Sequence, residues 1–427
     1  MAPMTKIVEL DDLDFGAYLR RGDSIVWGQA CGEPTSLVEA LIDQANTIGD
    51  LSAFAATSFS GLLTSDVADK IKISSMGAIG ALRALTAAGK LAIVPCHVGQ
   101  VGALITQGHI KCDVAFVQVS PPDANGNHSM GLIADHVRDA VDKARIVIAE
   151  VNDRVPFTLG DTLLSAEKIT CAVRVSRDPV EVPPAKISAT DEAIAKHAAQ
   201  YVEDGATLQV GIGATPDALL RLLNDRKDLG VHSGMIGDGL VDLVEMGVVT
   251  NARKPIDAGV SVTGALIGTK RLYEFADRNP AIAMRNAAYT HDAGVLAQLT
   301  KLVTINSALE VDLTGQVNAE QSGASYLGGT GGQVDYVRAG VRSLGGRSII
   351  ALPATAKRGE ISRITASLSG PVTTARTEVD VIITEFGAAE LRGQTLAERA
   401  KRLIAIAHPN FRDQLEHAAH DIFKRGF

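Results

Sequence analysis

Two glycine-rich segments have the composition of turns that bind anions. Residues 211–223 (GIGATPDALLRLL) follow an apolar run and open a helical pattern, and residues 328–336 (GGTGGQVDY) begin with four glycines in five positions. Backbone N–H groups at such turns can hold an anion or an oxygen-rich ligand. The first segment has neither the third glycine of a dinucleotide fingerprint nor the Lys-Ser/Thr of a P-loop, so by itself it favours an ordinary strand-to-helix turn. The second favours close approach of the backbone to a ligand over a flexible surface loop.

Polar side chains at the ends of apolar runs are a second group of candidates. Glu150 and Asn152 end one run, and Glu310 and Asn318 follow another. Ligands of parallel sheets lie beyond the carboxyl ends of the strands, so these turns could form the walls of a site, although each residue alone is better interpreted as a turn former. The stretches 95–100 (PCHVGQ) and 119–131 (VSPPDANGNHSMG) are interpreted in the same way.

The segment 232–247 (HSGMIGDGLVDLVEMG) is predicted to be a strand end, a turn and an amphipathic helix. Asp238 is better explained as a helix cap than as a catalyst, and His232 as a core histidine bonded to backbone. The ten histidines show no HExxH motif or pairing with acids that would indicate a metal centre.

The elements that must position these residues alternate between short β-branched runs and longer amphipathic stretches. Strands are expected within 24–29, 51–58, 91–98, 112–120, 144–152, 206–213, 302–313, 347–354 and 379–387. Helices are expected within 34–49, 75–89 and 191–204, and over the last segment from 395, with an interruption at His408-Pro409. This alternation predicts a mainly parallel sheet with helices on its faces.

Length and composition narrow the class of protein. The 427 residues are 46% hydrophobic and only 4% aromatic, and a net charge of −8 without a basic stripe argues against nucleic acid as the main partner. No apolar tract is long enough to cross a membrane, and the acidic N-terminal stretch is unlike a signal peptide, which predicts a cytoplasmic protein. Cys31, Cys96, Cys112 and Cys171 have no CxxC spacing, so neither a disulfide scaffold nor a cysteine zinc site is expected.

A proline-rich stretch divides the chain. Residues 176–188 (SRDPVEVPPAKIS) contain three prolines, and regular structure usually stops at such a stretch. The sequence therefore predicts an N-terminal α/β domain over residues 1–180 and a C-terminal α/β domain over 190–427. No internal repeat indicates a solenoid.

Taken together, motifs along nearly the whole chain resemble the acetyl-CoA hydrolase/transferase family, a 4-hydroxybutyrate CoA-transferase-like group within class I CoA-transferases. The motifs are GQACGEPTSLVEAL, VSPPDANGNHSMG, AEVNDRVPFTLGDT, GIGATPDALL, DGLVDLVEMGVVTN, INSALEVDLTGQVNAE, GGTGGQVDYVR, SIIALPATA, SRI and VTTARTEVDVIITEFGAAELRGQTLAERAKRLIAIAHPNFR. The resemblance implies two similar open, mainly parallel-sheet domains with the CoA thioester at their interface and the CoA site in the C-terminal half. It also implies a homodimer or larger homo-oligomer.

The resemblance also assigns roles to individual residues. The family's glycine-rich loop, here residues 328–332, would offer backbone N–H groups to CoA and to the thioester oxygen. The implied CoA-binding residues are Gly211, Ile212, Gly213, Ala214, Thr215, Gly329, Gly331, Gly332 and Lys357. The substrate would be an acyl-CoA, with a small carboxylate or water as acceptor, and no metal or cofactor is implied beyond coenzyme A itself.

One position departs from the family pattern. The segment around residue 234 usually reads His-Thr-Glu-x-x-x-Asp-Gly, with the Glu as nucleophile, and here that position is Gly234. A family asparagine that helps to hold the oxyanion falls at His291, which could act as a general base on water. Hydrolysis of an acyl-CoA is therefore expected over glutamyl-mediated CoA transfer. The alternatives are a transferase in which Gly234 is an introduced change, a C–C hydrolase of a β-keto acyl-CoA, and a CoA-ester-binding homologue without turnover.

Overall fold

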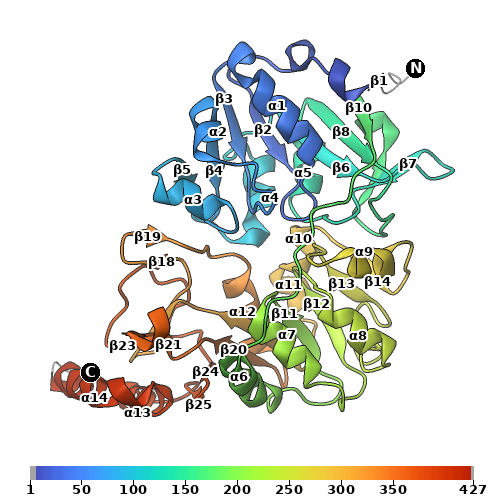
Figure 1. Cartoon of the computed structure of the whole chain (residues 1–427). Coiled ribbons are helices and arrows are strands. Elements are labelled where there is room, and N and C mark those ends of the chain that lie inside the picture. Colours follow the sequence, from blue (N-terminus) through green and yellow to red (C-terminus); the bar gives the residue numbers. More distant parts are fainter. Residues whose placement is uncertain (1–5, 425–427) are drawn as a thin grey trace. The chain divides into compact units, whose positions relative to one another are not determined.

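The alternating segments form two large, mainly parallel sheets in the computed structural model, which describes residues 6–424 (Figure 1). The predicted α/β class is therefore confirmed. The chain separates into two units, each described here by itself. The first contains the residues up to Pro183 together with Gly234–Asp238 and Ser261–Asp292, and the second contains Pro184–Ser233, Gly239–Val260 and the residues from Ala293.

The first unit contains a fully parallel sheet of eight strands. Their order is β1 (Lys6–Val8), β10 (Cys171–Val175), β8 (Ile146–Asn152), β6 (Val114–Val119), β2 (Ser24–Trp27), β3 (Leu51–Phe54), β4 (Ile71–Ser75) and β5 (Leu91–Ile93). Every residue of β2 and β6 is buried, because helices cover both faces of the sheet (Figure 1). This burial explains why these strands are continuous apolar runs in the sequence.

Helices of the first unit present one apolar side to the sheet. In α1 (Thr35–Ile48) the buried residues Leu37, Leu41 and Ala45 recur every four positions and pack with Ile25 and Trp27 of β2. The other helices are α2 (Ser65–Lys70), α3 (Leu82–Ala87), α4 (Val98–Thr106), α5 (Val137–Lys143), α9 (Lys270–Ala276) and α10 (Ala287–Thr290), with 3-10 turns η1 (Leu10–Asp12), η2 (Phe15–Ala17) and η3 (Ala166–Lys168). Two small strand pairs complete the unit, antiparallel β7 (Asn127–Ser129) with β9 (Leu163–Ser165) and parallel β13 (Ser261–Thr263) with β14 (Ile282–Met284).

The two units are not two continuous halves of the chain. No helix or strand lies between residues 176 and 188, and the units divide at Pro183 and Pro184. However, residues 234–238 and 261–292 group with the first unit. Backbone hydrogen bonds join them to it: Gly264 accepts from Ala134 N, Leu132 accepts from Leu266 N, and Leu159 accepts from Met284 N. Because backbone hydrogen bonds do not depend on side-chain type, the pattern of apolar residues in the sequence does not predict them.

The second unit is built around strands in the order β12 (Gly230–Ser233), β11 (Thr207–Val210), β15 (Leu302–Ser307), β20 (Arg347–Ala351), β24 (Val381–Thr384) and β25 (Gly387–Glu390). All are parallel except β25, which pairs antiparallel with β24. The helices are α6 (Ala189–Ala199), α7 (Ala214–Arg221), α8 (Gly239–Glu245), α11 (Ala293–Leu296), α12 (Gln333–Arg342), α13 (Leu396–Ile406) and α14 (Pro409–Lys424). The unit also contains short strands outside this sheet and one 3-10 turn. They are β16 (Glu310–Asp312), β17 (Val317–Asn318), β18 (Gln321–Ser322), β19 (Ser325–Tyr326), β21 (Thr355–Ala356), β22 (Ile361–Ser362), β23 (Ile364–Thr365) and η4 (Lys357–Gly359).

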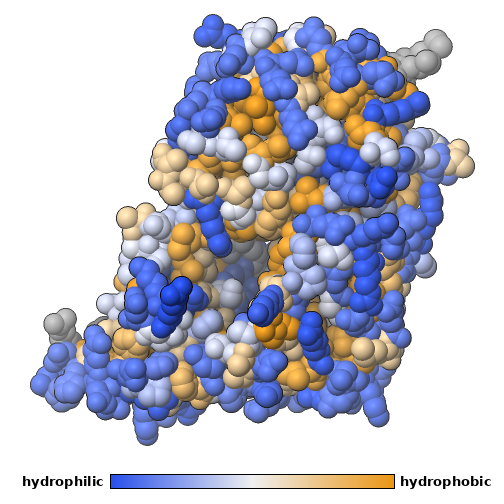
Figure 2. Space-filling model, in the orientation of Figure 1, coloured by the Kyte–Doolittle hydropathy of each residue, from blue (hydrophilic) through white to orange (hydrophobic). Residues whose placement is uncertain are grey.

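The C-terminal helices confirm the predicted interruption. Helix α13 ends at Ile406 and α14 begins at Pro409, where the fixed φ of proline suits the first helical turn. Apolar residues of both helices, including Leu403 and Leu415, join the core formed by β20 and β24. Figure 2 shows mainly hydrophilic side chains over the outer surface of these helices, as expected for amphipathic helices that cover a sheet.

Candidate active site

The parallel strands of the second unit bring the predicted binding segments to one edge of their sheet. Residues 211–215 follow β11, and η4, with Lys357, follows β20. Residues 328–332 lead into α12, which packs on β15 and β20 and begins at the same edge. Because the carboxyl ends of parallel strands meet at one edge, this is the expected location for a ligand.

The turn between β11 and α7 leaves room that the protein does not fill. A Cβ added to Gly211 or Gly213 would meet no atom within 4 Å, and Gly213 has a φ of 121° that favours glycine. Gly213 is also the N-cap of α7 and provides no side-chain acceptor for the first N–H groups of the helix. Ile212 and Ala214 are half-buried. The Thr215 hydroxyl donates to Asp191 Oδ1 at 2.7 Å, so it already has a role in joining α7 to α6.

The glycine-rich loop combines an anchored end and an open end. Gly328 is required by packing, because a Cβ there would lie 2.3 Å from the carbonyl oxygen of Ala319. The N–H groups of Leu327 and Gly328 donate to the carbonyl of Glu320 at 2.8 and 3.0 Å. Gly331 has a φ of 54° and open space around its Cβ position, and Gly332 caps α12 without a side-chain acceptor. Gly329 is half-buried between these ends. At the open end, α12 therefore begins without a side-chain cap, and the N–H of Gln333 donates to the carbonyl of Thr330 at 3.3 Å.

A buried polar layer supports this loop. Glu320 accepts from the hydroxyls of Tyr326 at 2.6 Å and Thr373 at 2.7 Å. The Asn318 amide donates to Glu310 Oε1 at 2.8 Å, and Glu310 also accepts from the backbone and hydroxyl of Ser369. Glu310 and Asn318, named from the sequence as turn formers or walls of a site, are therefore part of the support beneath the loop.

Lys357 lies on an exposed turn of unusual conformation. Lys357 and Arg358 have φ values of 47° and 59°, in the left-handed region that side chains rarely adopt, and both are exposed. The turn connects β21 and β22, which pair antiparallel just after β20. Two neighbouring cations are therefore presented on one hairpin of the second unit.

Gly234 and His291, the other predicted catalytic positions, belong to the first unit. Gly234 follows β12 directly, and its carbonyl accepts from Gly264 N at 3.2 Å. A Cβ at Gly264 would lie 3.0 Å from that carbonyl oxygen and 3.8 Å from Cβ of Asp135. His291 is buried at the end of α10, and its Nδ1 lies 2.9 Å from the hydroxyl of Thr290. The structure thus divides the predicted residues between the two units.

The carboxylates nearest to Gly234 in the first unit are engaged in other bonds. Asp238 accepts from both the backbone N–H and the hydroxyl of Thr269, at 3.0 and 2.7 Å, and so pins the start of α9. The capping interpretation of Asp238 is thus confirmed in kind, but it serves α9 and not the helix that follows it. Asp135 accepts from the Gln29 amide and from Val137 N. His232, predicted to be a core histidine, is fully buried in β12.

Two buried carboxylates of the first unit have structural roles that the sequence indicated only in part. Glu150 accepts from the N–H groups of Ser36 and Leu37 at the start of α1 and pairs with Arg177. Glu33, which the sequence did not single out, accepts from the N–H groups of Phe59 and Ser60. Burial raises the pKa of both carboxyl groups. The available signal for Glu33 was an acid in the Gly-Glu-Pro turn that follows the predicted strand 24–29.

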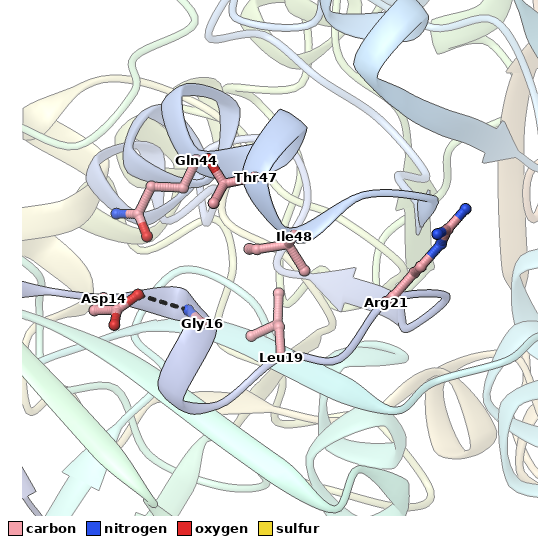
Figure 3. A pocket seen from close by; sticks show the side chains of 7 residues that line it. All are labelled: Asp14, Gly16, Leu19, Arg21, Gln44, Thr47 and Ile48. Atoms are coloured by element: carbon pink, nitrogen blue, oxygen red, sulfur yellow. Dashed lines mark hydrogen bonds between the residues drawn. The ribbon is translucent and has the colours of Figure 1, made fainter.

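Other cavities and clusters are remote from the predicted residues. A surface cavity of about 390 Å³ in the first unit is lined by η2 and the end of α1, where Leu19 and Ile48 face each other and Arg21 points away (Figure 3). Gln44 in its wall is already bonded to Leu13 and Phe15. Among residues 6–424, no group of three or more His, Cys, Asp or Glu is arranged to hold a metal ion. Within the same range, no helix combines the length and apolar character needed to cross a bilayer. The four cysteines are buried and free.

Comparison with known proteins covers the whole fold. Residues 11–218 match the acetyl-CoA hydrolase/transferase N-terminal domain, and residues 268–419 match the C-terminal domain. The chain is 40% identical over 395 residues to a 4-hydroxybutyrate coenzyme A transferase of Clostridium kluyveri, covering 92% of each chain. It is 36% identical to a succinyl-CoA:acetate/propanoyl-CoA:succinate CoA transferase of Fasciola hepatica, covering 97% of this chain and 87% of that one. The crystal structure of RipA from Yersinia pestis superposes with a TM-score of 0.92 at 35% identity, covering 98% of both chains.

Proposed function

Because the chain belongs to the acetyl-CoA hydrolase/transferase family, we propose that it hydrolyses an acyl-CoA, releasing a free carboxylic acid and coenzyme A. The observation that carries the choice of hydrolysis is Gly234. The position lacks the carboxylate that glutamyl-mediated transfer requires, and Asp238 and Asp135 are held by other bonds. With no carboxylate to attack the thioester, water is the remaining nucleophile.

Coenzyme A binds at the carboxyl edge of the second unit in this proposal. The N-termini of α7 and α12 have no side-chain cap and carry partial positive charge, which suits phosphate oxygens and a developing oxyanion. The open space at Gly211, Gly213 and Gly331 supports this assignment, because packing does not require glycine at those positions.

His291 is the base in the proposed reaction. The imidazole takes a proton from water as the water oxygen bonds to the thioester carbonyl carbon. The carbonyl is then re-formed, the C–S bond breaks, and the proton is returned to the departing sulfur. The contact with Thr290 holds the ring of His291 in one orientation. His291 belongs to the first unit, whereas the proposed CoA site belongs to the second. The role of His291 as the base is tested by measuring the rate of hydrolysis.

Transfer of CoA to a small carboxylate is the second candidate function. This candidate is favoured because the relatives in Clostridium kluyveri and Fasciola hepatica are CoA transferases. The two candidates differ in one product, because transfer forms a new acyl-CoA and hydrolysis does not.

A panel of acyl-CoA esters with and without acetate separates the two functions. Free thiol and new acyl-CoA are followed separately, and hydroxylamine and borohydride are used to trap any acyl or thioester adduct on the protein. We expect release of CoA that is independent of acetate, with no adduct. Acetate-dependent formation of acetyl-CoA with an adduct on a carboxylate contradicts hydrolysis and supports transfer.

Substitutions at two positions sharpen the test. Replacing His291 by Ala should reduce hydrolysis about 100-fold if the histidine is the base. Gly234→Glu should introduce CoA transfer and a trappable adduct at that residue, and Gly234→Gln is the matched control because it has the same size without a nucleophilic carboxylate. A folded, CoA-binding Gly234→Glu protein that transfers to no acceptor contradicts the assignment of this position.

A further inference from the structure

Arg363 is fixed by its backbone at the carboxyl edge of the second unit. It follows β22, and its N–H donates to the carbonyl of Ala354 at 2.9 Å while its own carbonyl accepts from Val311 N at 2.8 Å. Nη1 of its guanidinium donates to the carbonyl of Ala308 at 3.3 Å. The side chain is half-buried. Backbone bonds to Ala354 and Val311 therefore hold the main chain of Arg363 on two sides, and the carbonyl of Ala308 holds its guanidinium.

The groups around Arg363 come from the ends of three adjacent parallel strands. Ala308 follows β15 and Ala354 follows β20, and Glu385, the acid whose charge acts on Arg363, follows β24. Glu385 Oε2 is bonded to the backbone N–H of Ala354 at 2.8 Å. The guanidinium thus lies on the edge that also holds the starts of α7 and α12, where ligands of parallel sheets bind.

Three other arginines that are partly removed from water have a carboxylate partner, and the buried Arg399 donates instead to two carbonyls, those of Thr314 and Arg376. Arg177 pairs with Glu150, Arg145 pairs with Asp23, and Arg347 Nε lies 2.8 Å from Asp380. No carboxylate within residues 6–424 lies within ion-pairing distance of Arg363, and burial lowers its pKa. The guanidinium of Arg363 is partly dehydrated and donates to the carbonyl of Ala308, and such an arrangement is unfavourable unless an anion completes it.

We infer that Arg363 binds an oxyanion of the CoA ester, either a phosphate of the coenzyme or a carboxylate at the far end of the acyl chain. The planar fork of a guanidinium matches both groups, which can each accept two parallel hydrogen bonds. The exposed cations Lys357 and Arg358 on the same hairpin add to the positive potential around this anion. The inference rests on the proposed function, since it names a group of the same substrate.

Calorimetry with matched ligands tests the inference on the full-length chain. The probes are CoA, 3′-dephospho-CoA, and two thioethers of equal length, S-butyl-CoA and S-(3-carboxypropyl)-CoA, which the enzyme cannot hydrolyse. Arg363→Gln should weaken binding of the probe that carries the recognised anion by about 10- to 100-fold, the usual range for a hydrogen-bonded charge. Arg392→Gln, an exposed arginine after β25, is the control and should bind all probes like the wild type.

The pattern of the loss identifies the anion. A loss for CoA that disappears with 3′-dephospho-CoA indicates the 3′-phosphate. A loss specific to the carboxypropyl thioether indicates the acyl carboxylate. Equal losses for the four probes that are absent with S-butylpantetheine, which has no phosphate, indicate the diphosphate. A loss that extends to S-butylpantetheine, or unchanged affinity for every probe, overturns the inference.

Two further measurements keep the outcomes distinct. If Arg363→Gln does not fold, Arg363→Lys is used, because it keeps the charge and removes the fork; we expect a smaller loss for the same probe, and no loss overturns the inference. Wild-type protein that binds none of the CoA probes overturns both this inference and the proposed function. Wild-type binding that both variants retain overturns only the role of Arg363.

Discussion

The carboxyl edges of the two parallel sheets are completed in different ways. In the first unit the start of α1 is occupied by the protein itself, because Glu150 accepts two of its N–H groups and pairs with Arg177. In the second unit α7 and α12 begin at glycines without a side-chain acceptor. The same architecture therefore uses its anion-binding edge for internal bonding in one unit and leaves it available in the other. The fold alone therefore does not decide which of the two sheets binds a ligand.

Removing the internal anion of the first unit should have the largest effect. Glu150→Ala removes the carboxylate that pairs with Arg177 and leaves two buried N–H groups of α1 without their acceptor. We expect a loss of about 3–5 kcal/mol in the free energy of unfolding, measured by urea denaturation. The control is Arg154→Ala, whose ion pair with Asp178 is exposed and should contribute less than about 1 kcal/mol. If Glu150→Ala lowers the free energy of unfolding no more than the control does, the proposed difference between the carboxyl edges of the two sheets is contradicted.

Lys254 gives the second unit a buried charge without a close carboxylate. Its Nζ donates to the carbonyls of Val231 and Val260 at 2.9 and 2.6 Å, and burial lowers the pKa of its ammonium group to about 8. An unfolded lysine keeps its proton to about pH 10.4, so between these values the unfolded chain binds more protons than the folded one. Stability should therefore rise with pH across this interval, by about 3 kcal/mol at most.

The matched variant for this pH dependence is Lys254→Met, which keeps the apolar stem and removes the titrating group. The difference in unfolding free energy between wild type and variant should shift in favour of the wild type from pH 8 to pH 10. Parallel pH profiles would show that Lys254 does not bury its charge.

Filling the open edge of the second unit should have the smallest effect on folding and a specific effect on binding. Gly211→Ala and Gly211→Val add groups where no protein atom lies within 4 Å, and Gly211 does not need a positive φ. We expect the free energy of unfolding to change by less than about 0.5 kcal/mol. Affinity for CoA should fall about tenfold or more for Gly211→Val, corresponding to about 1.4 kcal/mol, as measured by calorimetry. Unchanged affinity in both folded variants would indicate that the open space serves another purpose.

The elements predicted from the sequence are those with strong apolar periodicity. The strands β2, β6, β8, β11, β15, β20 and β24 and the helices α1, α13 and α14 fall within predicted segments, and α6 begins two residues before its predicted start. Strand β4 (IKISS) and strand β10 (CAVRV) were not predicted. Each includes an exposed charged residue, Lys72 in β4 and Arg174 in β10, so neither forms a continuous apolar run.

The candidate site was predictable where glycine marks the backbone and not where position depends on tertiary bonds. Gly211, Gly213 and Gly331 were assigned to CoA binding from the family resemblance, and that role stays a prediction, although a Cβ at each position would meet open space. Arg363 was not singled out, because its isolation from carboxylates is a property of the folded chain. The grouping of Gly234 and His291 with the first unit depends on backbone hydrogen bonds through Gly264, which no side-chain pattern encodes.

The return of residues 234–238 and 261–292 to the first unit has a consequence for biosynthesis. The chain passes between the units after residues 183, 233, 238, 260 and 292. A ribosome that has reached Pro183 must still add 109 residues (292 − 183) before the first unit has all its parts. At usual elongation rates this delay is roughly 5–20 s. During that time the backbone groups of Leu132, Ala134 and Leu159 lack their final partners, so the first unit cannot finish folding until roughly a third of the second has been synthesised.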